Sequence, residues 1–372
     1  MTEGSVPRVE LAPGYAVPRV IHGAWQLSEG HGSGPAAGSA AGPGAAATGG
    51  EARRQAVQGL LRLAEAGFTA FDCADIYTGV EELLGEVLRA WRRCSGDLAA
   101  PELQVHTKLV PDLDALPELD RRYVERVVDR SLRRLGAERL DLVQLHWWDY
   151  AVPGYVEAAG WLDDLRRAGK VRHVGATNFD ARRLAEVLDA GVPVVSNQVQ
   201  HSLVDRRPEG ALAGLAAERG VALLGYGALA GGFLSARWLG APEPAGPATE
   251  LPNRSLTKYK LILEEFGSWE LVQELLAALA RIGERHGASL STVALRAALD
   301  RPGSAAAVLG ASGARHLPDT LRAFEIALDG DDRAALDAVL KKARGPSGPV
   351  YALERDRTGP HGRIMRYDLN RV

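Results

Sequence analysis

The sequence repeats one pattern eight times: a short apolar or β-branched run is followed by a longer amphipathic segment. Such runs are typical of strands and such segments of helices. A (β/α)8 TIM barrel needs eight strand–helix units, whereas open doubly wound sheets usually stop at roughly five to seven strands. The chain is therefore predicted to be an α/β protein in which residues 1–372 form a single TIM-barrel domain. The eight runs span residues 18–27, 70–75, 103–109, 140–147, 171–179, 194–202, 221–229 and 304–312.

The segments between these runs carry Arg and Glu on one face, as expected for helices that cover a barrel. Several of them end at a glycine, the residue that most readily adopts the left-handed conformation that closes a helix. The predicted helices span residues 52–66, 81–94, 121–135, 155–168, 181–190, 208–219 and 270–300. The terminating glycines are Gly67, Gly136, Gly169, Gly191 and Gly220.

Three segments interrupt the repeat. Residues 28–50 are low-complexity Gly, Ala, Ser and Pro, which predicts a loop with too few apolar groups to fold by itself. Residues 230–269 form a second long excursion, and residues 343–372 form a polar C-terminal tail. TIM-barrel sites form at the C-terminal ends of the strands, so all three are expected to shape a pocket there; surface decoration is the alternative. The residues expected to anchor the tail are Tyr351, Leu353, Ile364, Met365 and Tyr367.

Composition excludes several classes of protein. Cys73 and Cys94 are the only cysteines, which is too few for a disulfide scaffold, and their spacing fits no metal site. The chain carries 44 basic and 47 acidic residues, a net charge of −3 that gives no reason to expect nucleic acid or an anionic membrane as partner. No signal peptide or membrane-spanning run is visible, so a cytoplasmic protein without a metal is expected, with its oligomeric state open.

Three successive predicted strands end in an ionisable side chain. Asp72, Lys108 and His146 are in phase with the inward positions of their strands, so all three are expected at the top of the barrel. Barrel interiors are normally filled by Val, Ile and Leu, and a buried unpaired charge costs several kcal/mol, on the order of 3 or more. The three side chains must therefore pair with one another, perform chemistry, or both. An Asp72–Lys108 pair that merely plugs the barrel is the structural alternative.

Tyr77 follows Asp72 by five residues, where the loop could bring its hydroxyl over Lys108. A neighbouring ammonium favours the phenolate, which predicts that the pKa of Tyr77 falls from about 10 towards the range of a working proton donor. Only six of the 44 basic residues are Lys. A compact point charge at residue 108, in a chain whose basic residues are mostly Arg, suggests that the ammonium itself is needed there.

At these residues the chain resembles the aldo-keto reductase family. The resemblance covers roughly residues 17–340, and the motifs stand in the family's order. It implies a TIM barrel and a catalytic tetrad of Asp72, Tyr77, Lys108 and His146, with Tyr77 as general acid towards a carbonyl oxygen while hydride arrives from a nicotinamide. The matching motifs are FDCADIY (71–77), HTK (106–108), LVQLHWW (142–148), VGATNF (174–179), SNQ (196–198) and LLGYGALAGGFL (223–234).

The resemblance also assigns residues to the cofactor. Thr177, Asn178 and Gln198 match positions that hold the carboxamide, whose donor and acceptor groups Asn and Gln can satisfy. Tyr226 matches the aromatic residue on which the nicotinamide ring stacks. Trp25 and Trp147 match aromatic residues of the substrate pocket. The small or backbone-exposing residues expected along the pyrophosphate are Ala228, Leu229, Gly231 and Gly232.

The chain departs from the family pattern in three places. Cys73 replaces the commoner Thr and is expected to point outward, and Gly227 with Ala228 replaces Ser-Pro. The loop after the last strand lacks the usual pair of cations for the 2′-phosphate of NADPH; Gly310 and Ser312 fill the first positions. Arg315 and His316 are the remaining candidates, and one Arg binds a phosphate more weakly than two. NADPH is the expected cofactor, with NAD(H) as the alternative.

These features predict an NADPH-dependent oxidoreductase that reduces an aldehyde or ketone, or runs the reverse oxidation of an alcohol or lactol. A nucleotide-binding regulatory or redox-sensor barrel with little turnover is the alternative, although such a sensor would not need Tyr77. A tailoring reaction on a bulky metabolite is a third reading. The substrate is expected to be a small molecule, and the sequence leaves its identity and the direction of reaction open.

Overall fold

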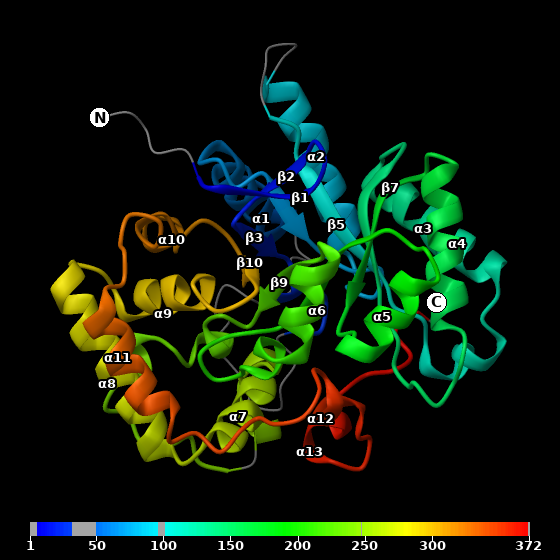
Figure 1. Ribbon diagram of the computed structural model, residues 1–372. Coiled ribbons are helices and arrows are strands. Elements are labelled where there is room, and N and C mark those ends of the chain that lie inside the picture. Colours follow the sequence, from blue (N-terminus) through cyan, green and yellow to red (C-terminus); the bar gives the residue numbers. More distant parts are fainter. Residues whose placement is uncertain (1–5, 32–49, 96–100, 247, 371–372) are drawn as a thin grey trace.

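The computed structural model describes residues 6–31, 50–95, 101–246 and 248–370, and within them eight strands close into one parallel barrel (Figure 1). Neighbouring strands follow the order of the sequence, and the last pairs with the first. The predicted TIM barrel is confirmed. Its strands are β3 (Val20–Gly23), β4 (Ala70–Asp72), β5 (Gln104–Leu109), β6 (Leu140–Leu145), β7 (Val171–Thr177), β8 (Val194–Gln200), β9 (Ala222–Tyr226) and β10 (Ser304–Gly310).

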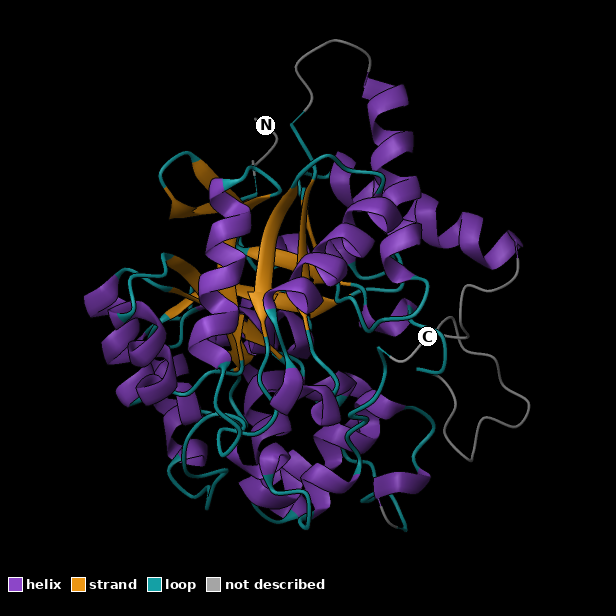
Figure 2. Ribbon diagram, turned by 90° about the vertical axis from the view of Figure 1, so that its right-hand side faces the viewer, coloured by secondary structure: helices purple, strands orange, loops and turns teal. Residues whose placement is uncertain are grey.

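Helices enclose the barrel, as Figure 2 shows around the orange strands. The predicted helix ends hold: Gly136 and Gly220 adopt φ of 62° and 67° and close the helices before them. Each apolar face packs on the strands, which forms a core that includes Leu60, Leu84 and Leu162. The helices of the repeat are α1 (Gly50–Glu65), α2 (Val80–Ser95), α3 (Arg121–Leu135), α4 (Tyr155–Arg167), α5 (Ala181–Asp189), α6 (Ala211–Arg219) and α9 (Leu290–Leu299).

One predicted helix is wrong. Residues 270–300 form two helices, α8 (Trp269–His286) and α9, because Gly287 takes a left-handed φ of 57° and ends the first. Ser289 then starts the second by accepting a hydrogen bond from the Thr292 N–H at 3.1 Å. The apolar period continues across the break, which is why periodicity alone suggested one helix.

A hairpin that the repeat does not include closes the N-terminal end of the barrel. It consists of β1 (Arg8–Ala12) and β2 (Tyr15–Pro18), paired antiparallel. The Tyr15 hydroxyl is buried and hydrogen-bonds His106 Nε2 at 3.0 Å, inside the barrel. Because side chains fill this end, a ligand can reach the barrel only from the opposite, C-terminal end of the strands.

The excursion at 230–269 is a packed layer. It contains short 3-10 turns and helix α7 (Arg254–Phe266), whose buried residues join α8 in a second apolar cluster. Phe233 and Phe266 are fully buried in this cluster. Two further helices, α10 (Leu317–Arg322) and α11 (Gly330–Leu340), follow the last barrel strand and precede the C-terminal tail. Residues 32–49 of the predicted loop at 28–50 lie outside the described residues.

The C-terminal tail is tied to the barrel by a buried ion-pair triad. Helix α12 (Ala352–Arg355) brings Glu354 to Arg207, which also pairs with Asp205. Arg207 Nη2 lies 2.6 Å from Asp205 Oδ2, Nη1 lies 3.2 Å from Glu354 Oε2, and none of the three side chains is more than 1% exposed. A short helix, α13 (Pro360–Arg363), follows. Of the expected anchors, Tyr351 is buried, Leu353, Ile364 and Met365 are partly buried, and the partly buried Tyr367 ring packs on Trp148 at 4.9 Å.

Replacing the central cation of this triad should destabilise the protein strongly. Arg207→Met leaves two buried carboxylates without a cation, and we expect a loss of about 3–5 kcal/mol in the free energy of unfolding. The urea midpoint measures it. Arg121→Met is the matched control, because Arg121 pairs with Glu125 and Asp164 on the exposed surface. Equal shifts in the two variants would contradict a structural role for the buried triad.

Candidate active site

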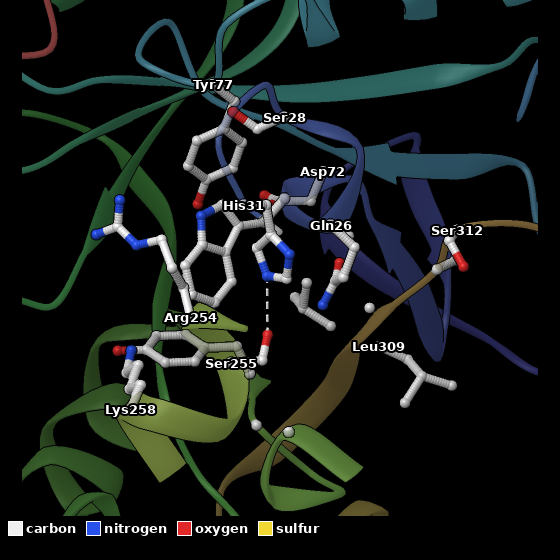
Figure 3. Close-up of a pocket in the computed structure, with 18 of the residues that line it drawn as sticks. Gln26, Ser28, His31, Asp72, Tyr77, Arg254, Ser255, Lys258, Leu309 and Ser312 are labelled. Atoms are coloured by element: carbon white, nitrogen blue, oxygen red, sulfur yellow. Dashed lines mark hydrogen bonds between the residues drawn. The ribbon is translucent and has the colours of Figure 1, made fainter. Parts of the chain in front are cut away.

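A cavity of about 1750 Å³ opens at the C-terminal ends of the barrel strands. Its floor includes Asp72, Lys108 and His146, the three side chains predicted there, and Tyr77 lies at its wall. In Figure 3, Tyr77 lies towards one end and Ser312 towards the other. Every residue that the sequence assigned to the cofactor also lines this cavity. The prediction that these scattered motifs form one site is therefore supported by the geometry.

Asp72 is the centre of a buried polar network. Its Oδ1 accepts a hydrogen bond from the Lys108 ammonium at 2.5 Å, and Oδ2 accepts from Gln144 at 3.0 Å and Gln198 at 2.6 Å. Lys108 also donates to the backbone oxygen of Cys73 at 2.8 Å. Although burial alone lowers the pKa of Lys108, the nearby Asp72 and Tyr77 raise it above its usual value, so the ammonium stays charged.

Tyr77 stands next to this ammonium, as predicted. The Lys108 Nζ lies 5.4 Å from the centre of the Tyr77 ring. The predicted fall in the pKa of Tyr77 is wrong for this structure: burial raises the pKa by more than Lys108 lowers it, and Asp72 raises it further. The sequence reveals the neighbouring cation but not the cost of burying a phenolate. Tyr77 therefore carries its proton at neutral pH.

His146 is buried and neutral. Burial, with Arg355 nearby, lowers its pKa to about 3. Its Nδ1 lies 3.4 Å from the Thr177 carbonyl oxygen, a contact that places the proton on Nδ1. Its Nε2 has no partner among the described residues. The rings of Trp148 and Tyr351 pack edge-on against the imidazole, at 4.3 and 5.3 Å between centroids, and hold it in place.

The pocket tryptophans differ from the prediction at one position. Trp25 lines the cavity, but Trp147 does not: it is fully buried and donates from its indole to the backbone oxygens of Asp149 and Val152. Trp148 lines the cavity instead. Alternation explains the error, because consecutive side chains point to opposite sides and His146 already faces inward. Cys73 is buried in the apolar core around the barrel, as predicted.

Asn178 is held in an unusual backbone conformation. Its φ is 63°, in the left-handed region that few residues other than glycine adopt without cost. The Arg355 guanidinium donates to its backbone oxygen at 2.9 Å, and the Tyr226 hydroxyl donates to its Oδ1, also at 2.9 Å. Thr177 is fixed nearby, because its hydroxyl donates to the Gln198 carbonyl oxygen at 3.0 Å. These contacts leave the Asn178 Nδ2 group available to a ligand.

The glycines after β9 serve two different purposes. Gly231, at φ 63°, has no room for a side chain, since a Cβ would lie 2.6 Å from Tyr259 Cδ2 and 3.0 Å from the Ser255 carbonyl oxygen. It is therefore required by the packing of α7. Gly232, at φ 103°, faces open space and leaves its backbone accessible. Of the other two residues predicted to contact pyrophosphate, Ala228 is buried and Leu229 is half-buried.

The predicted phosphate loop lies at the end of the cavity opposite Tyr77. Ser312 is exposed there, and Arg315 and His316 are exposed and contact each other, with Arg315 Nη2 3.0 Å from His316 Nε2. At Gly310, the space that a Cβ would occupy is filled by the Gln26 side chain. Arg62, from α1, lines the same cavity, although the sequence motifs did not point to it. The guanidinium groups of Arg62 and Arg315 thus both line the cavity.

Helix α7 contributes residues that the sequence motifs also missed. Ser255 Oγ lies 3.0 Å from His31 Nε2, so α7 and the loop after β3 meet across the cavity (Figure 3). The Lys258 ammonium lies 4.5 Å from the centre of the Tyr226 ring, and burial lowers the pKa of Lys258 to about 8. Arg254 lines the same wall. The one available signal was that Lys258 is one of only six lysines.

Two other kinds of site were searched for over the part of the chain that the structure describes. No helix there is both long and apolar enough to cross a bilayer. No group of three or more His, Cys, Asp or Glu side chains there could hold a metal ion.

Comparisons with known proteins point to one family. The Aldo/keto reductase family model matches residues 37–341. The flagellar radial spoke protein 5 of Chlamydomonas reinhardtii is 31% identical over 260 residues, which are 61% of this chain and 49% of that protein, so the match spans about half of this relative. Protein tas of Escherichia coli is 30% identical over 242 residues, 59% of this chain and 67% of its own length. The solved glycerol dehydrogenase of Gluconobacter oxydans has a TM-score of 0.70 at 22% identity, covers 94% of this chain and 99% of its own, and shows a shared fold.

The Asp72–Lys108 pair should show strong coupling in unfolding experiments. Lys108→Met leaves a buried carboxylate without its cation and Asp72→Asn leaves a buried ammonium without its anion, so each should cost about 3–5 kcal/mol. The double variant should cost less than the two single variants together, because it leaves neither charge unpaired. Urea midpoints of the four proteins test this. Simple additivity would show that the two groups do not depend on each other.

Proposed function

Since the chain belongs to the aldo/keto reductase family, we propose that it is an oxidoreductase that reduces an aldehyde or ketone with NADPH, or runs the reverse oxidation of an alcohol. One observation carries the proposal: Tyr77, Lys108 and His146 meet in one cavity around the buried Asp72. An ion pair that only filled the barrel would need neither the tyrosine nor the neutral histidine beside it. We also propose that residues 1–372 act as one catalytic domain.

The groups left without partners fit a nicotinamide. Its carboxamide offers an oxygen acceptor and an amide donor. The Asn178 Nδ2 can donate to the first. Both protons of the Gln198 amide are taken by Asp72 and Gln144, which leaves its Oε1 to accept from the second. Tyr226, whose hydroxyl is bound to Asn178, supplies an aromatic face beside these groups. When bound, the nicotinamide supplies the hydride that adds to the carbonyl carbon.

The proton is supplied by Tyr77. Its raised pKa keeps the hydroxyl protonated at neutral pH, so it can donate to the carbonyl oxygen as negative charge develops there. The Lys108 ammonium then stabilises the phenolate that remains, and Asp72 holds that ammonium in position. The neutral His146 has an unpaired Nε2 in the same cavity, where it can accept a hydrogen bond from a hydroxyl group of the ligand.

The remainder of the cavity suits a phosphorylated dinucleotide. Gly232 lets a diphosphate approach the backbone, because no side chain shields it. The contact between His31 and Ser255 joins the loop after β3 to α7 at the wall of this cavity, so these two segments would hold a dinucleotide there. Arg315 at the far end offers a cationic partner for a 2′-phosphate, and the His316 imidazole lies beside it. These contacts support NADPH over NADH.

Tyr77→Phe should remove almost all turnover, by at least about 100-fold, because the ring stays while the proton donor is lost. Binding of NADPH should be nearly unchanged. Stopped-flow measurement of NADPH oxidation, with a panel of aldehydes and ketones, tests the first expectation, and fluorescence titration tests the second. Retained turnover would remove Tyr77 from the role of acid. Tight NADPH binding without turnover by the unmodified protein would favour a sensor.

Arg315→Ala should change cofactor preference and leave the chemistry intact. We expect the KM for NADPH to rise about 10-fold, because a charged hydrogen bond to phosphate is lost, while the KM for NADH stays the same. Steady-state kinetics with both dinucleotides measures the ratio. Arg93→Ala, on the outer helix α2, is the control for loss of a positive charge. An equal rise for NADH would place Arg315 outside the 2′-phosphate site.

A further inference from the structure

Arg355, the last residue of α12, connects the C-terminal tail to the ends of two neighbouring barrel strands. Its Nη2 lies 2.9 Å from the Asn178 carbonyl oxygen, 3.1 Å from the Trp147 carbonyl oxygen and 2.9 Å from the Tyr150 hydroxyl. Asn178 directly follows β7, and Trp147 lies just beyond the end of β6. Among the described residues, those that line the cavity include Asn178 but not Arg355. Any effect of Arg355 on a ligand must therefore pass through the groups that it holds.

Neither an ion pair nor the fastening of the tail explains this arginine. In the part of the chain that the structure describes, no carboxylate lies within ion-pair distance of Arg355. Its guanidinium lies instead against two aromatic rings, 4.1 Å from the centre of Tyr150 and 5.2 Å from that of Tyr351. The tail is already fastened one residue earlier, where Glu354 pairs with Arg207. The oxygen atoms that Arg355 reaches are what its position serves.

The Asn178 backbone is the group that most needs such a contact. Its φ of 63° lies in the left-handed region, which a residue other than glycine keeps only where its surroundings fix it. The Asn178 N–H donates to the Gln198 carbonyl oxygen at 2.8 Å, and its own carbonyl oxygen accepts from Arg355. One side of the residue is thus fixed by the barrel and the other by the tail.

This backbone conformation decides where the Asn178 amide points. The side chain's Oδ1 is bound by the Tyr226 hydroxyl at 2.9 Å, which leaves Nδ2 for a ligand. Without Arg355, the nearest remaining donor to the Asn178 carbonyl oxygen is the Tyr150 hydroxyl at 3.5 Å, which is too long for a strong hydrogen bond. The residue could then relax out of the left-handed region, and its side chain would turn with the backbone.

We propose that Arg355 is a positioning residue for the nicotinamide: it holds Asn178 in the conformation that directs its amide to the carboxamide. The proposal rests on the proposed function, because it assumes a nicotinamide beside Asn178. An arginine suits this role, since its planar group can stack on Tyr150 while Nη2 reaches the oxygens. A lysine would keep the charge, but its shorter side chain would end before the position of Nη2.

Two nucleotides, with and without a nicotinamide, test this by binding alone. We would titrate the protein calorimetrically with NADPH and with ADP-ribose 2′-phosphate, which is the same nucleotide without its nicotinamide. Arg355→Met should weaken NADPH binding about 10-fold, as the loss of one well-placed hydrogen bond to the carboxamide requires. Its affinity for ADP-ribose 2′-phosphate should be unchanged, which also shows that the variant is folded.

Two further variants separate geometry from charge. Arg355→Lys keeps the positive charge and should still bind NADPH about 10-fold more weakly, because the ammonium does not reach the Asn178 oxygen. Arg357→Met is the matched control. Arg357 is an exposed cation of the same tail, 4.0 Å from Asp149, and its loss should leave the affinity for both nucleotides unchanged.

Asn178→Gly shows whether Arg355 acts through Asn178. Glycine keeps the left-handed backbone without cost and removes the amide. In that background, Arg355→Met should have almost no further effect on NADPH affinity, whereas two independent contributions would add.

Three results would overturn the proposal. Equal weakening of both nucleotides would mean that Arg355 only maintains the fold, and full affinity in Arg355→Lys would assign its effect to charge. Additive losses with Asn178→Gly would mean that Arg355 acts elsewhere. If the unmodified protein bound ADP-ribose 2′-phosphate and NADPH equally or bound neither, the proposed nicotinamide site itself would fail, a result distinct from these three.

Discussion

The buried pair of Asp72 and Lys108 is the interaction on which the site depends. A barrel interior gains little from an ion pair that apolar side chains could replace, so the cost of burying this pair must be offset by the further hydrogen bonds that both groups make. Asp72 accepts from Lys108, Gln144 and Gln198, which come from β5, β6 and β8. One carboxylate on β4 thereby fixes side chains from three other strands. Tyr77 has a cation beside it because of that arrangement.

The same network explains why two amide side chains have unequal freedom. Gln198 is committed through its nitrogen to Asp72 and Gln144, whereas Asn178 is committed through its oxygen to Tyr226. One is left with an acceptor and the other with a donor, which is the complement of a carboxamide. The barrel therefore orders the proposed reaction centre and the proposed cofactor contacts through one set of hydrogen bonds.

The sequence was sufficient to predict the barrel and the strand-end residues, since both follow from local patterns. The two-residue alternation of a strand places Asp72 and Lys108 inward. A glycine such as Gly136 after an amphipathic segment marks the end of a helix. The sequence failed for features that depend on packing, and for side chains beyond the end of a strand, where inward and outward positions must be extrapolated. That extrapolation is why Trp147 was predicted to line the cavity, although Trp148 does so. The pKa of Tyr77 is an example of a feature that depends on packing, because burial raises it by more than the neighbouring Lys108 lowers it.

Apart from Arg62 on α1, the cavity residues that could not be predicted come from segments outside the repeat. Arg254 and Lys258 belong to α7, and Arg355 belongs to the tail, which Glu354 fastens through Arg207 to the loop after β8. No period relates these residues to the strands they approach, so only the folded chain shows that they meet. This division has a physical consequence. The proposed proton transfer depends on side chains fixed by the barrel, whereas much of the positive charge along the cavity wall depends on α7 and the tail. Substitutions in α7 or the tail can therefore change this charge without disturbing the Asp72–Lys108 pair, on which the proposed proton transfer depends.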